Sequence, residues 1–228
     1  MRSWSPRLAG LAGAPRIWLV LAGAEEVPSG DGWLGRREQE VLAGLRFAPR
    51  RADWRLGRWT AKQALSRWRD GGAGASLTDP AAFEILAAEN GSPGAWLDGA
   101  PLDAALSLSH RAGSGLAAAT EPGLLVGCDL EIVEQRSDGF VRDFLRAEEQ
   151  EAVAARAPHE RPLAANLAWC GKECALKALR TGLRLDTREV RVDLAASLGD
   201  PDRGSAADAD WRRLVAAAPG LDVVGAGW

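Results

Sequence analysis

Several short stretches of the chain alternate apolar and polar positions or are apolar throughout, as β-strands are, whereas longer stretches repeat their apolar positions every three to four residues, as amphipathic helices do. The short stretches predict strands over residues 16–24, 82–87, 104–109, 115–119, 124–132 and 190–194. The longer stretches predict helices over residues 34–45, 46–69, 138–156 and 163–181. A stretch rich in Gly, Asp and Ala predicts a loop over residues 198–208.

The turn residues Glu121-Pro122-Gly123 interrupt this pattern near the middle of the 228 residues. A chain of this length can form one large domain or two packed halves. We therefore predict an N-terminal half over residues 1–122 and a C-terminal half over residues 123–228. No internal repeat is evident in the sequence.

The apolar stretch over residues 17–24 has two interpretations. It ends like a signal-peptidase site, but Pro15 and Arg16 limit it to eight residues. That is the length of a buried strand, which we favour, and secretion is the alternative. No apolar run approaches the ~18 residues of a membrane-spanning helix, so we expect no membrane segment.

Composition and charge narrow the possible functions. The net charge of −3 argues against a general nucleic-acid binder. The 28 basic residues include only the lysines Lys62, Lys172 and Lys177. A coding sequence rich in G and C explains the excess of arginine. It also draws attention to the remaining lysines, because lysine differs from arginine as a titratable point charge.

The three cysteines, Cys128, Cys170 and Cys174, lie inside apolar patterns. We interpret them as small buried side chains of a protein in a reducing, cytoplasmic compartment. Because Cys170 and Cys174 are four residues apart, a metal or redox pair is the alternative. It would need further ligands, and the chain has only two histidines, His110 and His159.

Two carboxylates indicate chemistry in the predicted strand over residues 124–132. Residues two apart in a strand face the same side, so Asp129 and Glu131 are expected roughly 7 Å apart. Paired carboxylates repel each other unless a cation or a shared proton relieves them, and an all-oxygen site suits Mg²⁺. The solvent-facing side of a strand is the alternative interpretation.

Two of the predicted helices carry polar side chains in register. Residues 163–181 place Trp169, Glu173 and Lys177 on successive turns. A Glu four residues before a Lys is also a common surface pair, worth ~0.2–0.5 kcal/mol. The helix predicted over residues 46–69 aligns Arg51, Arg55, Arg58 and Lys62 on one face. This face is either an anion-binding site or simply a solvated basic surface.

Three segments together resemble the signature series of the Sfp-type 4′-phosphopantetheinyl transferases. They are Gly127-Cys-Asp-Leu-Glu131, Phe144-Leu-Arg-Ala-Glu148 and Trp169-Cys-Gly-Lys-Glu-Cys-Ala-Leu-Lys177, in the order and at the approximate spacing of that family. Ser107-Leu-Ser-His110 and the basic helix are similar to its coenzyme A phosphate contacts, so the resemblance covers residues 46–181. It departs at Cys174, where Ala is usual, and at Ser92, where the family often has Lys.

The resemblance implies an α/β (α+β) fold of two similar halves that form a pseudo-dimer. It implies that 4′-phosphopantetheine is transferred from coenzyme A to a serine of an apo acyl or peptidyl carrier protein, with release of 3′,5′-ADP. A monomer is expected, because both halves supply the site. One alternative is a non-catalytic coenzyme A-binding regulator, which Ser92 favours; another is a Mg²⁺-dependent phosphohydrolase.

The resemblance also implies residue roles. Mg²⁺ would be held by Asp129, Glu131 and Glu173. Glu173 would act as the base, Lys177 would stabilise or protonate the leaving phosphate, and Lys172 would contact phosphate oxygens. Glu148 would support the site. Coenzyme A contacts are expected from Arg51, Arg55, Arg58, Lys62, Ser109, His110, Lys172 and Lys177.

Overall fold

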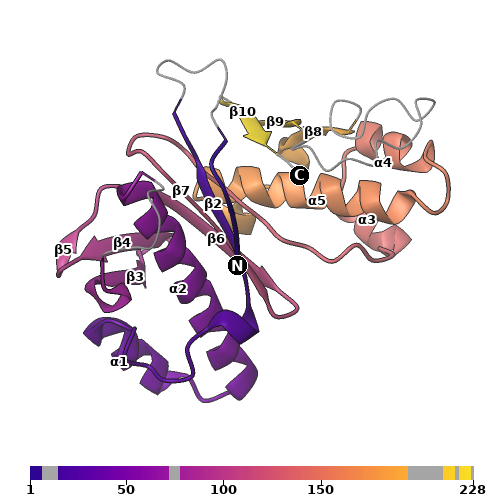
Figure 1. Ribbon diagram of the computed structural model, residues 1–228. Helices are drawn as coiled ribbons and strands as arrows, with labels where there is room; N and C mark the ends of the chain where they lie inside the picture. The colour runs from indigo at the N-terminus through magenta and orange to yellow at the C-terminus, as the bar shows by residue number, and fades with distance from the viewer. Residues whose placement is uncertain (7–14, 72–77, 195–212, 219–220, 227–228) are drawn as a thin grey trace. The chain divides into compact units, whose positions relative to one another are not determined.

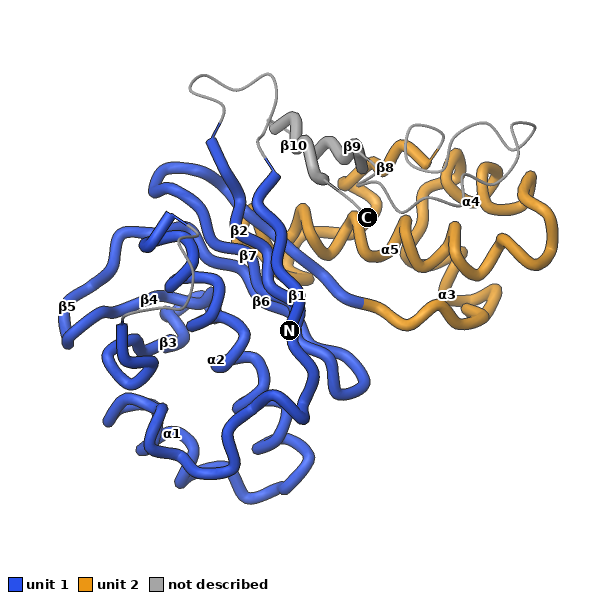
Figure 2. Tube along the Cα trace, in the orientation of Figure 1, with its two compact units in different colours: residues 1–130 blue, residues 131–228 orange. Residues whose placement is uncertain are grey.

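The computed structural model describes residues 1–6, 15–71 and 78–194, together with the backbone of residues 213–218 and 221–226. The chain divides into two compact units, unit 1 over residues 1–130 and unit 2 over residues 131–228 (Figure 2). Each unit combines antiparallel strands with helices. The predicted mixed α/β class is therefore confirmed.

Unit 1 is built on a four-stranded antiparallel sheet with the strand order β1-β2-β7-β6. A long helix, α2 (Ala48–Arg69), packs on one face of this sheet (Figure 1). Its apolar stripe meets the sheet in a core that includes Ala61, Leu65, Leu106 and Ala117. The strands are β1 (Arg2–Trp4), β2 (Trp18–Gly23), β6 (Ala105–Arg111) and β7 (Ser114–Thr120).

A smaller antiparallel sheet completes unit 1, with the strand order β3-β4-β5. Its strands are β3 (Phe83–Ala87), β4 (Pro93–Leu97) and β5 (Ala100–Pro101), and Phe83 and Ile85 extend the core of α2. The turn between β3 and β4 contains Gly91 at φ +84°, a conformation that favours glycine. The short helix α1 (Arg36–Gly44) contacts β3.

Unit 2 packs a long helix, α5 (Arg161–Ala178), against antiparallel strands in the order β10-β9-β8. The core contains Leu145, Ala165, Leu176 and Val192. The other elements are α3 (Asp138–Phe144), α4 (Ala147–Ala154), β8 (Arg191–Asp193), β9 (Arg213–Ala218) and β10 (Leu221–Ala226). Short 3₁₀ helices cover Ala24–Glu26 and Pro80–Ala82 in unit 1, and Gly182–Arg184 and Thr187–Glu189 in unit 2.

Most predicted elements are confirmed, but the helix predicted over residues 138–156 is two helices. Leu145 and Arg146 between α3 and α4 have extended ψ angles of 147° and 160°. Leu145 is fully buried, and Glu149 accepts a hydrogen bond from the backbone N–H of Arg146 at 2.9 Å. This capping box starts a new helix, because a glutamate three residues after the N-cap satisfies a free N–H there.

The strand predicted over residues 124–132 is wrong, because residues 124–137 have no regular secondary structure. Side chains of β6 bind part of this segment instead of a strand ladder. The backbone N–H of Cys128 donates to Ser107 Oγ at 3.0 Å, and Ser109 Oγ donates to Asp129 Oδ1 at 2.8 Å. The loop predicted over residues 198–208 lies outside the described residues. No helix in the described part of the chain is long and apolar enough to cross a membrane.

Candidate active site

Asp129 is a buried carboxylate whose direction is set by β6. Its side chain is 6% exposed, and its Oδ1 accepts the Ser109 hydroxyl. Ser107 and Ser109 are two apart in β6, so they lie on one face of the strand. Ser109, which was expected at a coenzyme A phosphate, therefore orients a predicted metal ligand.

Glu131 lies against the predicted catalytic face of α5, within unit 2. Its Oε1 accepts a hydrogen bond from Trp169 Nε1 at 3.1 Å, and its Oε2 pairs with Arg136 Nη2 at 3.1 Å. Trp169 is fixed by edge contacts with the rings of Phe140 and Phe144, each 5.1 Å away between centroids. The acidic segment and the helix thus meet through side chains of unit 2.

Glu173 and Lys177 follow Trp169 at intervals of four residues on α5, so the three share one helix face. Both side chains are half-buried. Unit 2 therefore brings Glu131 to the face that carries the predicted base and the predicted lysine. Asp129 is the second-to-last residue of unit 1, and only Leu130 separates it from Glu131.

The chemistry of these carboxylates suits Mg²⁺, which prefers hard oxygen ligands and usually takes few of them from the protein. Among the described residues, no three His, Cys, Asp or Glu side chains are grouped as a metal site. Glu131 is engaged by the guanidinium of Arg136, which supplies the positive charge beside it. The residue types fit the ion.

Lys172 is a buried structural lysine. It is fully buried, and its Nζ pairs with Glu149 Oε2 at 2.8 Å. The same Nζ donates to the backbone carbonyls of Thr187 at 3.0 Å and Val190 at 2.6 Å. Burial lowers the pKa of Lys172, although Glu149 opposes that shift. With its three N–H groups satisfied inside unit 2, Lys172 does not fit the expected role at phosphate oxygens.

Lys62 repeats this arrangement in unit 1. It is 1% exposed, and its Nζ pairs with Glu38 Oε2 at 2.6 Å and donates to the Trp33 carbonyl at 2.9 Å. Burial lowers its pKa too, against the effect of Glu38. The expected role of Lys62 as a coenzyme A contact does not fit these partners either.

Two arginines of α2 bind the protein's own backbone. Arg51 Nη1 donates to the carbonyls of Leu42 and Leu45 at 2.6 and 3.1 Å, at the C-terminal end of α1. Arg55 pairs with Asp31 at 3.1 Å and donates to carbonyls of residues 28–30. The basic positions of α2 thus anchor neighbouring segments and do not form one open phosphate-binding face.

Arg58 and His110 are the unit 1 candidates that remain for a ligand. Arg58 lies over the ring of Trp54 at 4.3 Å, and burial lowers its pKa to about 10 against the effect of Glu38. His110 is exposed at the end of β6. A Cβ on Gly57 would lie 3.7 Å from His110 Cδ2, so His110 lies beside α2. Ser92, at the position where the resembling family often has Lys, donates to Asn90 Oδ1 at 2.7 Å.

The two lysine clusters are an internal repeat that the sequence interpretation missed. In each unit the glutamate binds the lysine and caps the N-terminus of its own helix. It also accepts a hydrogen bond from the backbone N–H of a strand residue. Glu38 accepts from Ile85 at 2.9 Å, and Glu149 accepts from Val192 at 2.8 Å. The following glutamines also match, because Gln39 and Gln150 donate to the carbonyls of Leu34 and Leu145 at 2.9 Å. The signal was present in Leu34-Gly-Arg-Arg-Glu-Gln-Glu40 and Leu145-Arg-Ala-Glu-Glu-Gln-Glu151.

The repeat also shows that Glu149, and not the expected Glu148, is the buried glutamate of this motif. Glu148, which was expected to support the site, is exposed and pairs with Arg146 at 3.5 Å. Its pKa is lowered by a backbone hydrogen bond and by Arg146. The buried carboxylate is Glu149, the next residue.

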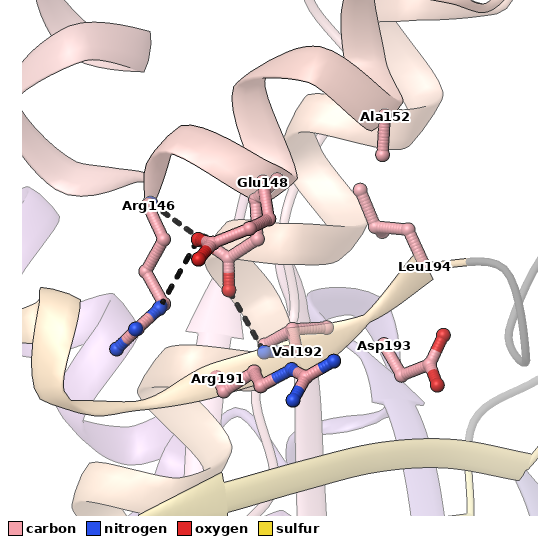
Figure 3. A pocket seen from close by; sticks show the side chains of 8 residues that line it. Arg146, Glu148, Ala152, Arg191, Val192, Asp193 and Leu194 are labelled. Carbon is pink, nitrogen blue, oxygen red and sulfur yellow. Dashed lines mark hydrogen bonds and ion pairs between the residues drawn. The ribbon is translucent and has the colours of Figure 1, made fainter.

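A shallow pocket of unit 2 lies beside this cluster, lined by charged residues of both signs that include Arg146, Glu148, Arg191 and Asp193 (Figure 3). At the equivalent positions of unit 1, Arg37 and Glu84 pair at 2.6 Å, and Arg37 lies over the Trp96 ring at 5.0 Å. Glu84 pairs in register with Trp96, whereas Arg191 pairs with Ala217.

Comparisons with known proteins agree with the motif series. Residues 125–217 match the family model of the 4′-phosphopantetheinyl transferase superfamily, which does not specify the Sfp type. No curated protein sequence matches the chain.

Solved structures with partial likeness include three synthases. One is a holo-(acyl-carrier-protein) synthase from Bacillus anthracis in complex with CoA (3′,5′-ADP), with 19% identity, coverage of 47% of this chain and 96% of the other, and a TM-score of 0.37. The holo-[acyl-carrier-protein] synthase of Thermotoga maritima has 19% identity, 55% and 71% coverage and a TM-score of 0.38. The ACPS-CoA complex of Chronobacterium ammoniagenes has 20% identity, 47% and 96% coverage and a TM-score of 0.38.

Proposed function

We propose that the protein transfers 4′-phosphopantetheine from coenzyme A to a serine of an apo carrier protein, because residues 125–217 match the family model of the 4′-phosphopantetheinyl transferase superfamily. The observation that carries the proposal is the hydrogen bond between Trp169 and Glu131. It joins the acidic motif to the α5 face of Glu173 and Lys177. Each segment alone has a surface explanation, and their contact does not.

The reaction forms a bond between the serine oxygen and the β-phosphorus of coenzyme A. It breaks the bond from that phosphorus to the bridging oxygen, which leaves with 3′,5′-ADP. Glu173 takes the hydroxyl proton, directly or through a water molecule. Lys177, on the same helix face, stabilises the negative charge that develops on the leaving phosphate.

Asp129, Glu131 and Glu173 would hold Mg²⁺. When bound, the ion supplies positive charge to the pyrophosphate and orients it. Ser109 keeps the Asp129 carboxylate in one direction, and Arg58 and His110 of unit 1 contact the donor phosphates. Lys62, Lys172, Arg51 and Arg55 are left out of the proposed site, because their donor groups bind the protein itself.

We also propose a cytoplasmic monomer. The thiols of Cys128 and Cys170 are buried and that of Cys174 is half-buried, which suits a reducing compartment.

The test is incubation of the purified protein with coenzyme A, Mg²⁺ and an apo acyl carrier protein, followed by mass spectrometry of the carrier. We expect a phosphopantetheine adduct on the carrier serine, and its loss in Asp129→Ala and Glu173→Ala at unchanged circular dichroism. Coenzyme A binding without any adduct, under several metals and carriers, would instead support a coenzyme A-binding regulator. Coenzyme A cleavage without a carrier would support a phosphohydrolase.

A further inference from the structure

Glu149 joins three elements of unit 2 at one carboxylate. Its Oε2 accepts from the backbone N–H of Arg146 at the start of α4 and pairs with Lys172 of α5. Its Oε1 accepts from the backbone N–H of Val192 in β8 at 2.8 Å. Only 3% of the Glu149 side chain is exposed, so water does not compete strongly for these bonds.

Lys172 in turn fixes the rotation of α5. Its ammonium is held by Glu149 and by two backbone carbonyls, those of Thr187 and Val190. A helix residue whose side chain is held at three points cannot turn about the helix axis without breaking them. Because successive residues are 100° apart on a helix, fixing Lys172 fixes the direction of Glu173.

We propose that Glu149 is a positioning residue: through Lys172 it sets the rotation of α5 and so the directions of Glu173 and Lys177. The inference rests on the proposed function for its catalytic consequence. It assigns Lys172 to the support of the site and not to phosphate contact. A small displacement of a catalytic group can cost about 100-fold in rate, so this support is expected to be measurable in turnover.

Unit 1 provides a matched control within the same chain. Glu38 and Lys62 form the same buried pair, with the same cap and the same kind of strand N–H. After Lys62, however, the chain has Gln63 where α5 has Glu173, and Arg67 where α5 has Lys177. Breaking the pair in unit 1 therefore disturbs an equivalent buried charge without moving the proposed base.

The experiment compares Glu149→Gln with Glu38→Gln. Both substitutions leave a buried lysine charge without its carboxylate partner. Both are therefore expected to lower the melting midpoint, by on the order of 10 °C. At a temperature where both are folded by circular dichroism, Glu149→Gln is expected to lower kcat about 10- to 100-fold with little change in KM for coenzyme A. Glu38→Gln is expected to keep kcat within about twofold of the wild type.

A second variant, Glu149→Asp, keeps the negative charge beside Lys172 but is one methylene too short to hold all three donors. It is expected to fold more stably than Glu149→Gln and still to lose kcat. Equal kcat losses in Glu149→Gln and Glu38→Gln at matched folded fractions would overturn the proposal. An increase in KM for coenzyme A with unchanged kcat would also do so.

Amide hydrogen exchange separates this inference from the proposed function. In Glu149→Gln, the amides of residues 161–178 are expected to lose protection, whereas in Glu38→Gln they are not. If the wild type transfers no phosphopantetheine, the function is refuted while the exchange result still tests the positioning of α5. Unchanged protection of α5 in Glu149→Gln refutes the positioning role whatever the activity.

Discussion

The substitution Lys62→Met distinguishes a buried structural pair from a phosphate contact. It removes the ammonium that pairs with Glu38 Oε2 at 2.6 Å and leaves a fully buried carboxylate without its counter-charge. Breaking such a pair from one side costs about 3–5 kcal/mol. Glu38 keeps two backbone donors, the N–H groups of Gly35 and Ile85, so we expect the lower end of that range.

For a chain of this size, about 3 kcal/mol corresponds to a fall of roughly 6–12 °C in the melting midpoint. The measurement is thermal and urea unfolding followed by circular dichroism, together with KM for coenzyme A below the transition. The matched control is Arg36→Ala, which breaks a pair whose side chains are 92% and 63% exposed and is worth at most about 0.5 kcal/mol. If Lys62→Met is as stable as Arg36→Ala, or if it raises KM for coenzyme A tenfold, the structural role assigned to Lys62 is refuted.

Three further predictions concern single contacts. Ser109→Ala removes the donor 2.8 Å from Asp129 and should cost about 1.5–3 kcal/mol in urea unfolding and raise the Mg²⁺ concentration for half-maximal transfer. Ser92→Ala, which removes an exposed hydrogen bond to Asn90, should do neither. Arg136→Gln removes the charge that competes at Glu131, so half-maximal transfer should need less Mg²⁺; a higher requirement would contradict the fit of Glu131 to the ion. Burial raises the pKa of Glu84, but the hydrogen bonds and charge of Arg37 outweigh it and hold that pKa below its usual 4.5. Glu84 therefore stabilises the fold above pH 4.5 and loses this effect as pH falls through its lowered pKa. In Glu84→Gln, the free energy of unfolding should fall less steeply as the pH is lowered. The same pH dependence as in the wild type would refute this role of Glu84.

The sequence predicts the elements well where apolar periodicity is strong. Helices α2 and α5 and strands β2, β6 and β7 appear close to their expected bounds, because each buries one face in a core of its own unit. Residues 124–132 were apolar enough to predict a strand. They form no ladder: the backbone N–H of Cys128 donates to the hydroxyl of Ser107, and the side chain of Asp129 accepts from the hydroxyl of Ser109.

In the candidate site, too, the sequence pattern predicts which residues share a face but not which partners they bind. Sequence spacing alone groups Trp169, Glu173 and Lys177, since residues four apart share a helix face. It also grouped four basic residues of α2 on one face, yet the donor groups of Arg51, Arg55 and Lys62 bind different partners. Spacing gives the side of a helix but not the depth of burial. Burial depends on segments distant in sequence, such as α1 with Glu38 and β3 with Ile85.

The scarcity of lysine now has an explanation that differs from the one expected. At Lys172 the ammonium meets three acceptors, Glu149 Oε2 and two carbonyls, which equals its three N–H groups. At Lys62 it meets one carboxylate, one carbonyl and the Trp33 ring, 5.2 Å from its centroid.

An arginine would bring five N–H donors in a rigid planar fork into either place, so at least two would remain buried without a partner. Lysine is therefore retained, despite the codon bias towards arginine, at positions where the surrounding structure offers only three acceptors to a compact charge. Of the three lysines, Lys177 alone lies half-buried on the face shared with Glu173, and it is the lysine that the proposed function assigns to phosphate chemistry.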